Sequence, residues 1–254
     1  MPINKTQALV LRTFDFRETS LIVSFYTKDF GKIHGILKGI RTEPDKFAST
    51  LEPFSHNEII FYQKKNAGLH LVSACDLKNN FLSLRNDMYR FGHASFMMEL
   101  LDALTPLEDK NEAIFDLTME CLSHMDMNIN YEKIPTIYKI KILSLSGFKP
   151  HLNSCVCCND RILSQSKFSN YLGGLLCPRC FKKDVKATLI FRGTVASISY
   201  IEKNDLSNNL RLGLNPQIKR ELDNLLNSFI EFHLEKKLKT QRVLPYLENV
   251  LEKV

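Results

Sequence analysis

The amino-acid sequence predicts an α+β multidomain protein, in which a small five-stranded β-barrel precedes an α-helical domain. Five short segments rich in β-branched and aromatic residues lie within the first 80 positions, and from there apolar residues recur at helical spacing. Four cysteines in two matched pairs interrupt the helical half. The length of 254 residues agrees with two domains of roughly 100–200 residues each. We therefore expect domains at residues 1–79 and 80–254, with a cysteine-bearing insertion at about 150–185.

Polar turns separate the segments that define the barrel. The expected strands are Gln7–Phe14, Ser20–Thr27, Ile33–Leu37, Glu58–Gln63 and Leu69–Cys75. Glu43–Leu51 is expected to form a short helix, because Pro44 suits a first helical turn. Three strands, a helix and two strands is the order of the OB barrel, whose usual ligands are single-stranded nucleic acids. A small SH3-like barrel is the main alternative, because strand count alone does not separate the two.

The second half of the chain has the apolar periodicity of packed helices. The expected helices are Asn80–Leu104, Ala113–Met125, Ile134–Ser146, Thr188–Glu202 and Pro216–Leu238, with a short last one at Pro245–Leu251. Pro106 ends the first of them, and Gly147 with Pro150 ends the third. We interpret the methionine and phenylalanine positions of these helices as core rather than as a cofactor pocket.

Composition and charge narrow the class of protein. Hydrophobic residues make up 44% of the chain and charged residues 24%, which is typical of a globular protein. No uncharged apolar stretch approaches the ~20 residues that span a bilayer, and charged residues such as Arg12 and Asp15 interrupt the region where a signal peptide has its apolar core. We therefore expect a cytoplasmic protein. The net charge is +3 over residues 1–80, −3 over 81–150 and +6 over 151–254, a balance that weakly favours a polyanionic partner.

The cysteines carry the most specific signal. The chain has seven, an odd number that argues against a disulfide framework in a protein without an export signal. Cys155 and Cys158 form one C-x2-C pair, and Cys177 and Cys180 form a second after 18 intervening residues. This spacing predicts one tetrahedral zinc ion bound by four thiolates. Four protein ligands leave no open position for substrate, so we expect a structural role for the metal.

Neighbouring residues refine this prediction. Asn159 tolerates the left-handed backbone conformation that such a turn often needs, and residues 171–174 are expected to form the turn of a small ribbon. Cys157 is expected not to bind the metal, because the turn geometry favours Cys158. Buried free thiols or a redox pair are the alternatives for the cluster, and His151 is a conceivable replacement for one cysteine.

Catalytic motifs are missing from the sequence. It contains no phosphate-binding G-x4-G-K-[ST] loop, no H-E-x-x-H, no G-x-S-x-G and no G-x-G-x-x-G motif. The seven histidines are dispersed without the spacing of metal ligands or of an acid–base pair. We therefore expect a binding protein rather than an enzyme.

Short motifs follow one another over nearly the whole chain. They are Ala8–Arg12, Arg17–Val23, Tyr26–Gly31, Leu37–Arg41, Leu51–Phe54, the cysteine pairs, Phe229–Lys239 and Val243–Leu247. In order and spacing they resemble the RecO family of bacterial recombination mediator and DNA-repair proteins. The resemblance implies an N-terminal OB fold, a C-terminal helical domain and a zinc-binding insertion.

The resemblance also implies an activity and partners. It implies binding of single- and double-stranded DNA, annealing of complementary strands, and help in loading the RecA recombinase onto coated single strands. The implied partners are RecR and single-stranded DNA-binding protein, with RecA reached indirectly, at the bacterial nucleoid. Annealing needs no nucleotide hydrolysis, which agrees with the missing phosphate-binding loop.

Basic residues of the barrel and of the insertion are the candidates for phosphate contact. The candidates are Arg12, Lys38, Arg41, Lys46, Lys64, Lys65, Arg179, Lys182 and Lys183. Such residues provide a salt-dependent affinity that is indifferent to base sequence. Arg161, Lys167 and Lys186 are expected to extend the group around the cysteines into one track with the barrel residues. Glu43 and Asp45 interrupt a stretch that is usually basic in the family. We therefore expect the lysines of the insertion to contribute more to DNA binding than this stretch does.

Aromatic residues of the expected barrel are candidates for contact with bases. Phe14, Phe16 and Tyr62 are candidates for base stacking, with packing in the core as the alternative for each.

The leading hypothesis is a non-enzymatic DNA-binding and strand-annealing mediator. The alternatives are a protein-interaction adaptor whose DNA contact is secondary and, with less support, a metal-dependent nuclease or RNA-modifying enzyme.

Overall fold

The structure, a computed structural model, describes residues 2–42, 47, 51–64, 68–127, 131–163 and 165–244. The chain divides into two compact units. The barrel unit comprises residues 1–131 and the segment from residue 238 onward, and the helical unit comprises residues 132–237. The predicted helix Pro245–Leu251 lies outside the described residues, as does Glu43–Leu51 apart from Phe47 and Leu51. The predicted domain boundary between residues 79 and 80 stays a prediction.

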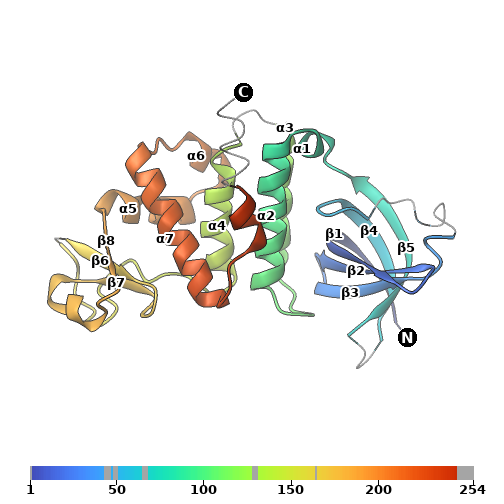
Figure 1. Cartoon of the computed structure of the whole chain (residues 1–254), viewed down its shortest axis with the longest axis horizontal. Helices are drawn as coiled ribbons and strands as arrows, with labels where there is room; N and C mark the ends of the chain where they lie inside the picture. Colours follow the sequence, from blue (N-terminus) through green and yellow to red (C-terminus); the bar gives the residue numbers. More distant parts are fainter. Residues whose placement is uncertain are drawn as a thin grey trace. The chain divides into compact units, whose positions relative to one another are not determined.

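Five strands close into a barrel in the barrel unit (Figure 1). They are β1 (Ile3–Phe16), β2 (Ser20–Thr27), β3 (Gly31–Leu37), β4 (His56–Tyr62) and β5 (His70–Asn79). The strand order is β1-β2-β3-β5-β4, and β1 also pairs with β4. The β3–β5 pair is parallel and the other pairs are antiparallel. This arrangement is that of an OB barrel, which decides against the SH3-like alternative.

The first strand closes the barrel because it is long and bent. Its N-terminal half, Ile3–Leu9, pairs with β4, and its C-terminal half, Ala8–Phe16, pairs with β2. A register shift between Val10 and Arg12 bends the strand between the two pairings, as β-bulges do. On β3, a Cβ atom at Gly35 would lie 2.5 Å from Cγ2 of Val72 and 3.2 Å from Cε2 of Phe25, so only glycine fits in this crowded interior.

Three helices follow the barrel in the same unit. They are α1 (Leu82–Asn86), α2 (Met88–Leu104) and α3 (Glu112–Met127). The prediction of one helix over Asn80–Leu104 was wrong, because the backbone is extended at Asp87. The Asp87 carboxylate accepts the backbone N–H groups of Tyr89 and Arg90 and thereby starts α2 as a new helix. Apolar periodicity did not reveal this break, because the apolar positions continue across it.

The helical unit is built from four helices and a small sheet. The helices are α4 (Ile134–Leu145), α5 (Arg192–Lys203), α6 (Leu206–Arg211) and α7 (Pro216–Leu234). Lys139 is buried between α4 and α7, where its Nζ donates to Oδ1 of Asn227 at 3.0 Å and to Oδ1 of Asp223 at 3.3 Å. Helix α6 was not predicted, because six residues are too few to show a period. Helix α7 ends earlier than predicted, since Glu235 adopts a left-handed conformation (φ 52°).

The sheet belongs to the insertion, which we call the cysteine module (residues 150–190). Its strands β6 (Ser166–Ser169), β7 (Gly174–Leu176) and β8 (Thr188–Ile190) lie in the order β7-β6-β8. The predicted turn at residues 171–174 joins β6 to β7. The prediction that Thr188 begins a helix was wrong, because Thr188–Ile190 pairs with β6 and α5 starts at Arg192. Within the described part of the chain, no helix is long and apolar enough to cross a membrane.

Candidate metal centre and nucleic-acid surface

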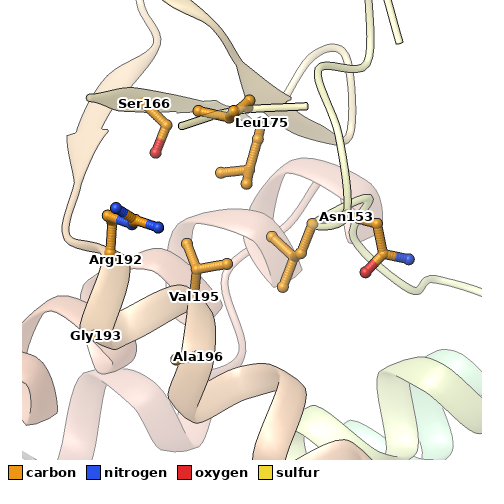
Figure 2. A pocket seen from close by; sticks show the side chains of 9 residues that line it. Asn153, Ser166, Leu175, Arg192, Gly193, Val195 and Ala196 are labelled. Atoms are coloured by element: carbon orange, nitrogen blue, oxygen red, sulfur yellow. The ribbon is translucent and has the colours of Figure 1, made fainter. Parts of the chain in front are cut away.

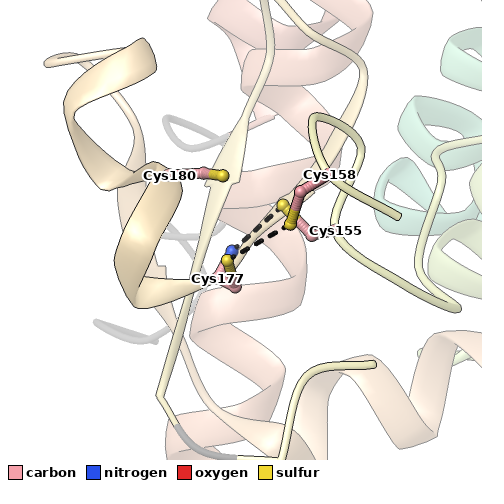
Figure 3. Close-up of side chains that lie close together, drawn as sticks. All are labelled: Cys155, Cys158, Cys177 and Cys180. Carbon is pink, nitrogen blue, oxygen red and sulfur yellow. Dashed lines mark hydrogen bonds between the residues drawn. The ribbon is translucent and has the colours of Figure 1, made fainter. Parts of the chain in front are cut away.

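The four predicted ligand cysteines converge in the cysteine module. Their Sγ atoms all lie within 4.8 Å of one another, and Figure 3 shows that the thiols of the two pairs point towards a common centre. Cys155, Cys177 and Cys180 are buried, whereas Cys158 is exposed. The cluster therefore sits at the edge of the module, where one ligand position faces solvent.

Local backbone geometry explains why the two pairs close up. The N–H of Asn159 donates to the carbonyl of Cys155, and the N–H of Cys180 donates to the carbonyl of Cys177, both at 2.8 Å. Asn159 adopts the left-handed conformation (φ 58°) that its residue type predicted. The second pair opens η2, a 3-10 helix over Pro178–Lys183.

The segment before the first pair is held against the ribbon by a close backbone approach. The N–H of Leu175 donates to the carbonyl of His151 at 3.0 Å. A Cβ atom at Gly174 would lie 2.6 Å from that same carbonyl oxygen, so the approach requires glycine. This contact brings Cys155 to the strand that ends next to Cys177.

The electrostatics of the thiols are those of a site for a cation. Burial would raise the pKa of Cys155, but backbone N–H groups, first among them that of Cys177 at 3.4 Å from the sulfur, lower the pKa to about 6. Burial and the neighbouring thiols, foremost Cys158, raise the pKa of Cys180 to about 12. Four thiolates cannot ionise side by side without a compensating positive charge, and a metal ion supplies that charge.

The geometry fits a tetrahedral metal ion. With metal–sulfur bonds of about 2.3 Å, a tetrahedral zinc site has sulfur–sulfur edges of about 3.8 Å. The Sγ atoms of Cys158 and Cys177 are 3.7 Å apart. Zinc held here would have four thiolate ligands and would act by cross-linking the two turns.

Residues next to the cluster have other roles. Cys157 is exposed and lies outside the group of four. His151 is also outside it, and its Nε2 instead lies 2.7 Å from Oγ of Ser154. The Asp160 carboxylate is 3.4 Å from Sγ of Cys158 and forms an ion pair with Arg179. Sequence reasoning did not single out Asp160.

Three of the arginines predicted to contact nucleic acid, Arg12, Arg41 and Arg179, are engaged within their own units. Arg12 on β1 forms an ion pair with Asp102 of α2, and Arg41 forms one with Asp15. Arg179 is paired with Asp160, as described above. These carboxylates partly neutralise the positive charge that the sequence places at these positions. Neither Asp15 nor Asp102 was recognised as a partner from the sequence.

The predicted lysines differ from the arginines. Lys38, Lys182 and Lys183 are exposed, and none has a carboxylate within ion-pair distance among the described residues. Lys64 is half-buried, and its backbone N–H donates to Nδ1 of His70 at 3.3 Å. Lys46 and Lys65 lie outside the described residues. Positive charge that is available to a ligand is thus found mainly at lysines.

The outer face of β2 and β3, which OB folds commonly use for ligands, is covered in the barrel unit. Ser24 and Tyr26 face away from the barrel core and yet are buried. Lys32 donates to the carbonyl of Asp102 at 2.7 Å and to its carboxylate at 3.2 Å, and the Tyr26 hydroxyl donates to the carbonyl of Asn111 at 3.3 Å. The open part of the barrel is therefore its β1–β2 end.

Aromatic side chains do lie at that open end. The Phe14 side chain is 50% exposed, and the guanidinium of Arg17 stacks over the Phe16 ring at 5.2 Å. Tyr62, the third candidate for stacking, is half-buried at the end of β4. Phe14 is thus the candidate whose ring is most available to a base.

The chain thus combines a closed OB barrel with a helical unit that carries a cluster of four cysteines. Comparison with known sequences finds a family with two matching domains. The family model described as "Recombination protein O N terminal" matches residues 1–81, and "Recombination protein O C terminal" matches residues 85–242. The chain belongs to the RecO family.

Individual relatives cover almost the whole chain. The DNA repair protein RecO of Alkaliphilus metalliredigens is 31% identical over 233 residues, which are 91% of this chain and 94% of that protein. The protein of the same name from Dehalococcoides mccartyi is 31% identical over 236 residues, or 92% of each chain. That of Halalkalibacterium halodurans is 27% identical over 247 residues, or 97% of this chain and 96% of that protein. Membership of this family gives the chain a role in DNA repair and recombination.

Proposed function

We propose that this protein is a non-enzymatic mediator that binds single- and double-stranded DNA and anneals complementary strands. The observation that carries the proposal is the pair of exposed lysines, Lys182 and Lys183, at the end of η2, where no carboxylate of the described residues neutralises them. Lysines of this kind bind phosphates as point charges and do not read base edges. An annealing protein needs such sequence-independent contact with both strands.

The barrel contributes a second, smaller contact in this proposal. Lys38 and Phe14 lie at the open part of the barrel and offer a phosphate contact and a stacking surface. Arg12, Arg41 and Arg179 take part only if a phosphate displaces the carboxylate partner of each. Lys46, Lys64 and Lys65 stay candidates for phosphate contact.

The metal in the proposal is one structural zinc ion on Cys155, Cys158, Cys177 and Cys180. Support comes from the convergence of the four sulfurs and from the 3.7 Å edge. The zinc would fix η2 and would thereby hold Lys182 and Lys183 on one surface of the module. It takes no part in bond breaking, because four protein ligands leave no open position.

Family membership extends the proposal to partners. We propose that the protein acts with RecR and single-stranded DNA-binding protein, and that it assists the loading of RecA on coated single strands at the nucleoid in the cytoplasm. An adaptor that only bridges proteins is the competing function, and it predicts that DNA affinity is dispensable.

The test is an annealing assay with complementary labelled oligonucleotides, naked and coated with single-stranded DNA-binding protein. We expect annealing without added nucleotide and affinity for single strands that falls steeply as salt rises. The double substitution Lys182→Gln with Lys183→Gln should slow annealing. If the protein neither binds nor anneals oligonucleotides at low salt, the proposed function is wrong and the adaptor is favoured.

A further inference from the structure

A pocket lies in the helical unit, between the cysteine module and α5. It has a volume of about 470 Å³ and is open to solvent. Its lining consists of Leu152, Asn153, Ile162, Ser166, Leu175, Arg192, Gly193, Val195 and Ala196. Figure 2 shows Ser166 and Leu175 approaching from the sheet and Arg192 and Val195 from α5. A volume in this range is typical of small-molecule and cofactor sites.

Ser166 places an unused hydroxyl in this pocket. The residue is only 3% exposed, and its Oγ points into the cavity in Figure 2. No backbone or side-chain group of the described residues forms a hydrogen bond with it. Because the pocket is open to solvent, this hydroxyl is available to a ligand that displaces water from it. The walls around it are aliphatic, from Leu175 and Val195 among others.

Arg192 places an available cation at the edge of the same pocket. It is the first residue of α5, and its guanidinium extends along the cavity below Ser166 (Figure 2). Its one hydrogen bond that we identify is a long one, from Nη1 to the carbonyl of Leu163 at 3.4 Å. Unlike Arg12, Arg41 and Arg179, it has no carboxylate within ion-pair distance in the described part of the chain.

Together these groups fit a ligand with an apolar body, a hydrogen-bonding edge and a negative charge. Pockets that hold an extruded base combine apolar side chains on its faces with hydrogen bonds to its edge. A guanidinium at the rim is suited to the phosphate that follows the base. No carboxylate lines the pocket, so nothing in the lining repels a phosphate. Ser166 also adjoins Lys167, one of the basic residues of the cysteine module.

We propose that this pocket captures one nucleotide of a bound single strand, with its base between the aliphatic walls, its edge on Ser166 and its phosphate on Arg192. The inference rests on the proposed function, because it assumes that single-stranded DNA binds this protein. It adds a site that distinguishes single strands from duplex, since a base within a duplex cannot enter the pocket. Lys182 and Lys183 would bind both forms.

The first measurement is photo-crosslinking of the full-length, zinc-loaded protein to a 5′-phosphorylated single strand of thymidines that carries one 4-thiothymine. We expect crosslinks to map by mass spectrometry to the walls, within residues 152–162 or 192–196. Hybridising the strand to its complement should abolish these crosslinks. Crosslinks that map elsewhere, or that persist unchanged in the duplex, overturn the inference.

The second measurement compares affinities of variants for the same strand. Arg192→Gln should weaken binding of the single strand by about tenfold and binding of the duplex by less than about twofold. Arg211→Gln is the matched control, because Arg211 is an exposed arginine of the helical unit that neither lines the pocket nor belongs to the proposed DNA contacts. It should leave the affinity for both forms nearly unchanged. Ser166→Ala removes only the hydroxyl and should weaken single-strand binding by a smaller factor.

The outcomes separate the site from the function. If the wild type binds single strands and Arg192→Gln with Ser166→Ala binds them equally well, the pocket serves another ligand, such as an apolar carboxylate, and the inference is wrong while the proposed function stands. If the wild type does not bind DNA at all, both fail. Zinc content and circular dichroism of each variant establish that it is folded.

Discussion

The barrel unit and the cysteine module use positive charge in different ways. On the barrel, Arg12, Lys28 and Lys32 are tied by ion pairs to acidic residues of α2 and α3. On the module, Lys182 and Lys183 have no such partner among the described residues. Equal numbers of basic residues therefore do not mean equal capacity to bind a polyanion. In this protein carboxylates of the barrel unit neutralise much of the barrel's positive charge, whereas Lys182 and Lys183 of the module remain available to a ligand.

The largest expected effect concerns the metal that holds the module together. Cys177→Ser removes a buried ligand and should abolish binding of one zinc equivalent. At structural zinc sites the binding free energy, about 10–16 kcal/mol in small zinc-binding peptides, is also folding free energy. The module should therefore unfold and become sensitive to protease, while the barrel unit stays folded. Elemental analysis and limited proteolysis check both points.

Cys157→Ser is the control for that experiment, because the exposed Cys157 lies outside the cluster. It should keep its zinc and its protease resistance. Zinc retained in the Cys177→Ser protein, or lost from the Cys157→Ser protein, would show that the ligand set is wrong.

The next effect tests the difference in free charge. Lys182→Gln with Lys183→Gln should lower the affinity for single-stranded DNA roughly tenfold at low salt and should reduce the salt slope by about 0.7 for each lost phosphate contact. Arg12→Gln with Arg41→Gln removes the same formal charge from the barrel and should change affinity by less than about twofold, because both arginines are already paired. Titrations of a labelled oligonucleotide at several salt concentrations provide the measurement. A larger loss in the arginine variant would reverse the comparison.

A moderate effect on stability is expected from the acidic partner in α2. Asp102→Asn leaves Arg12 and the largely buried Lys32 without their carboxylate and should lower the free energy of unfolding by about 1–3 kcal/mol. Asp116→Asn removes the partner of the more exposed Lys28 and should cost clearly less. Denaturant unfolding monitored by circular dichroism distinguishes the two. Equal losses would mean that burial of the Asp102 pairs is unimportant.

The smallest expected effect is a pH dependence. Burial lowers the pKa of His34, aided by Lys32, and burial lowers the pKa of His56, aided by Lys78. A histidine with a lowered pKa binds fewer protons when folded than when unfolded, so the free energy of unfolding falls as pH drops below about 6.5 until the lower, folded-state pKa is passed. Replacing both with glutamine should flatten this fall below about pH 6.5. An unchanged slope would assign the acid sensitivity to other groups.

Some elements of this fold are encoded in local sequence, and others depend on contacts that local sequence does not show. All five strands were predicted, because each is a short β-rich run bounded by turns, and their order around a helix-length gap indicated an OB barrel before any contact was known. The cysteine cluster was equally visible, because the geometry of metal binding constrains the spacing of its ligands. The break at Asp87 and the strand Thr188–Ile190 were missed, since a side-chain cap and a pairing with β6 override local periodicity.

Local sequence was sufficient to locate the five strands along the chain, the helical half and the four thiols, because each depends on local patterning or on ligand spacing. Tertiary structure alone decided which cations are free, because ion pairs such as that of Arg12 with Asp102 join residues far apart in the chain. It also placed Ser166 and Arg192 in one pocket, although neither belongs to a recognisable motif. Contacts between distant segments depend on how the chain folds back on itself, and no local pattern encodes them.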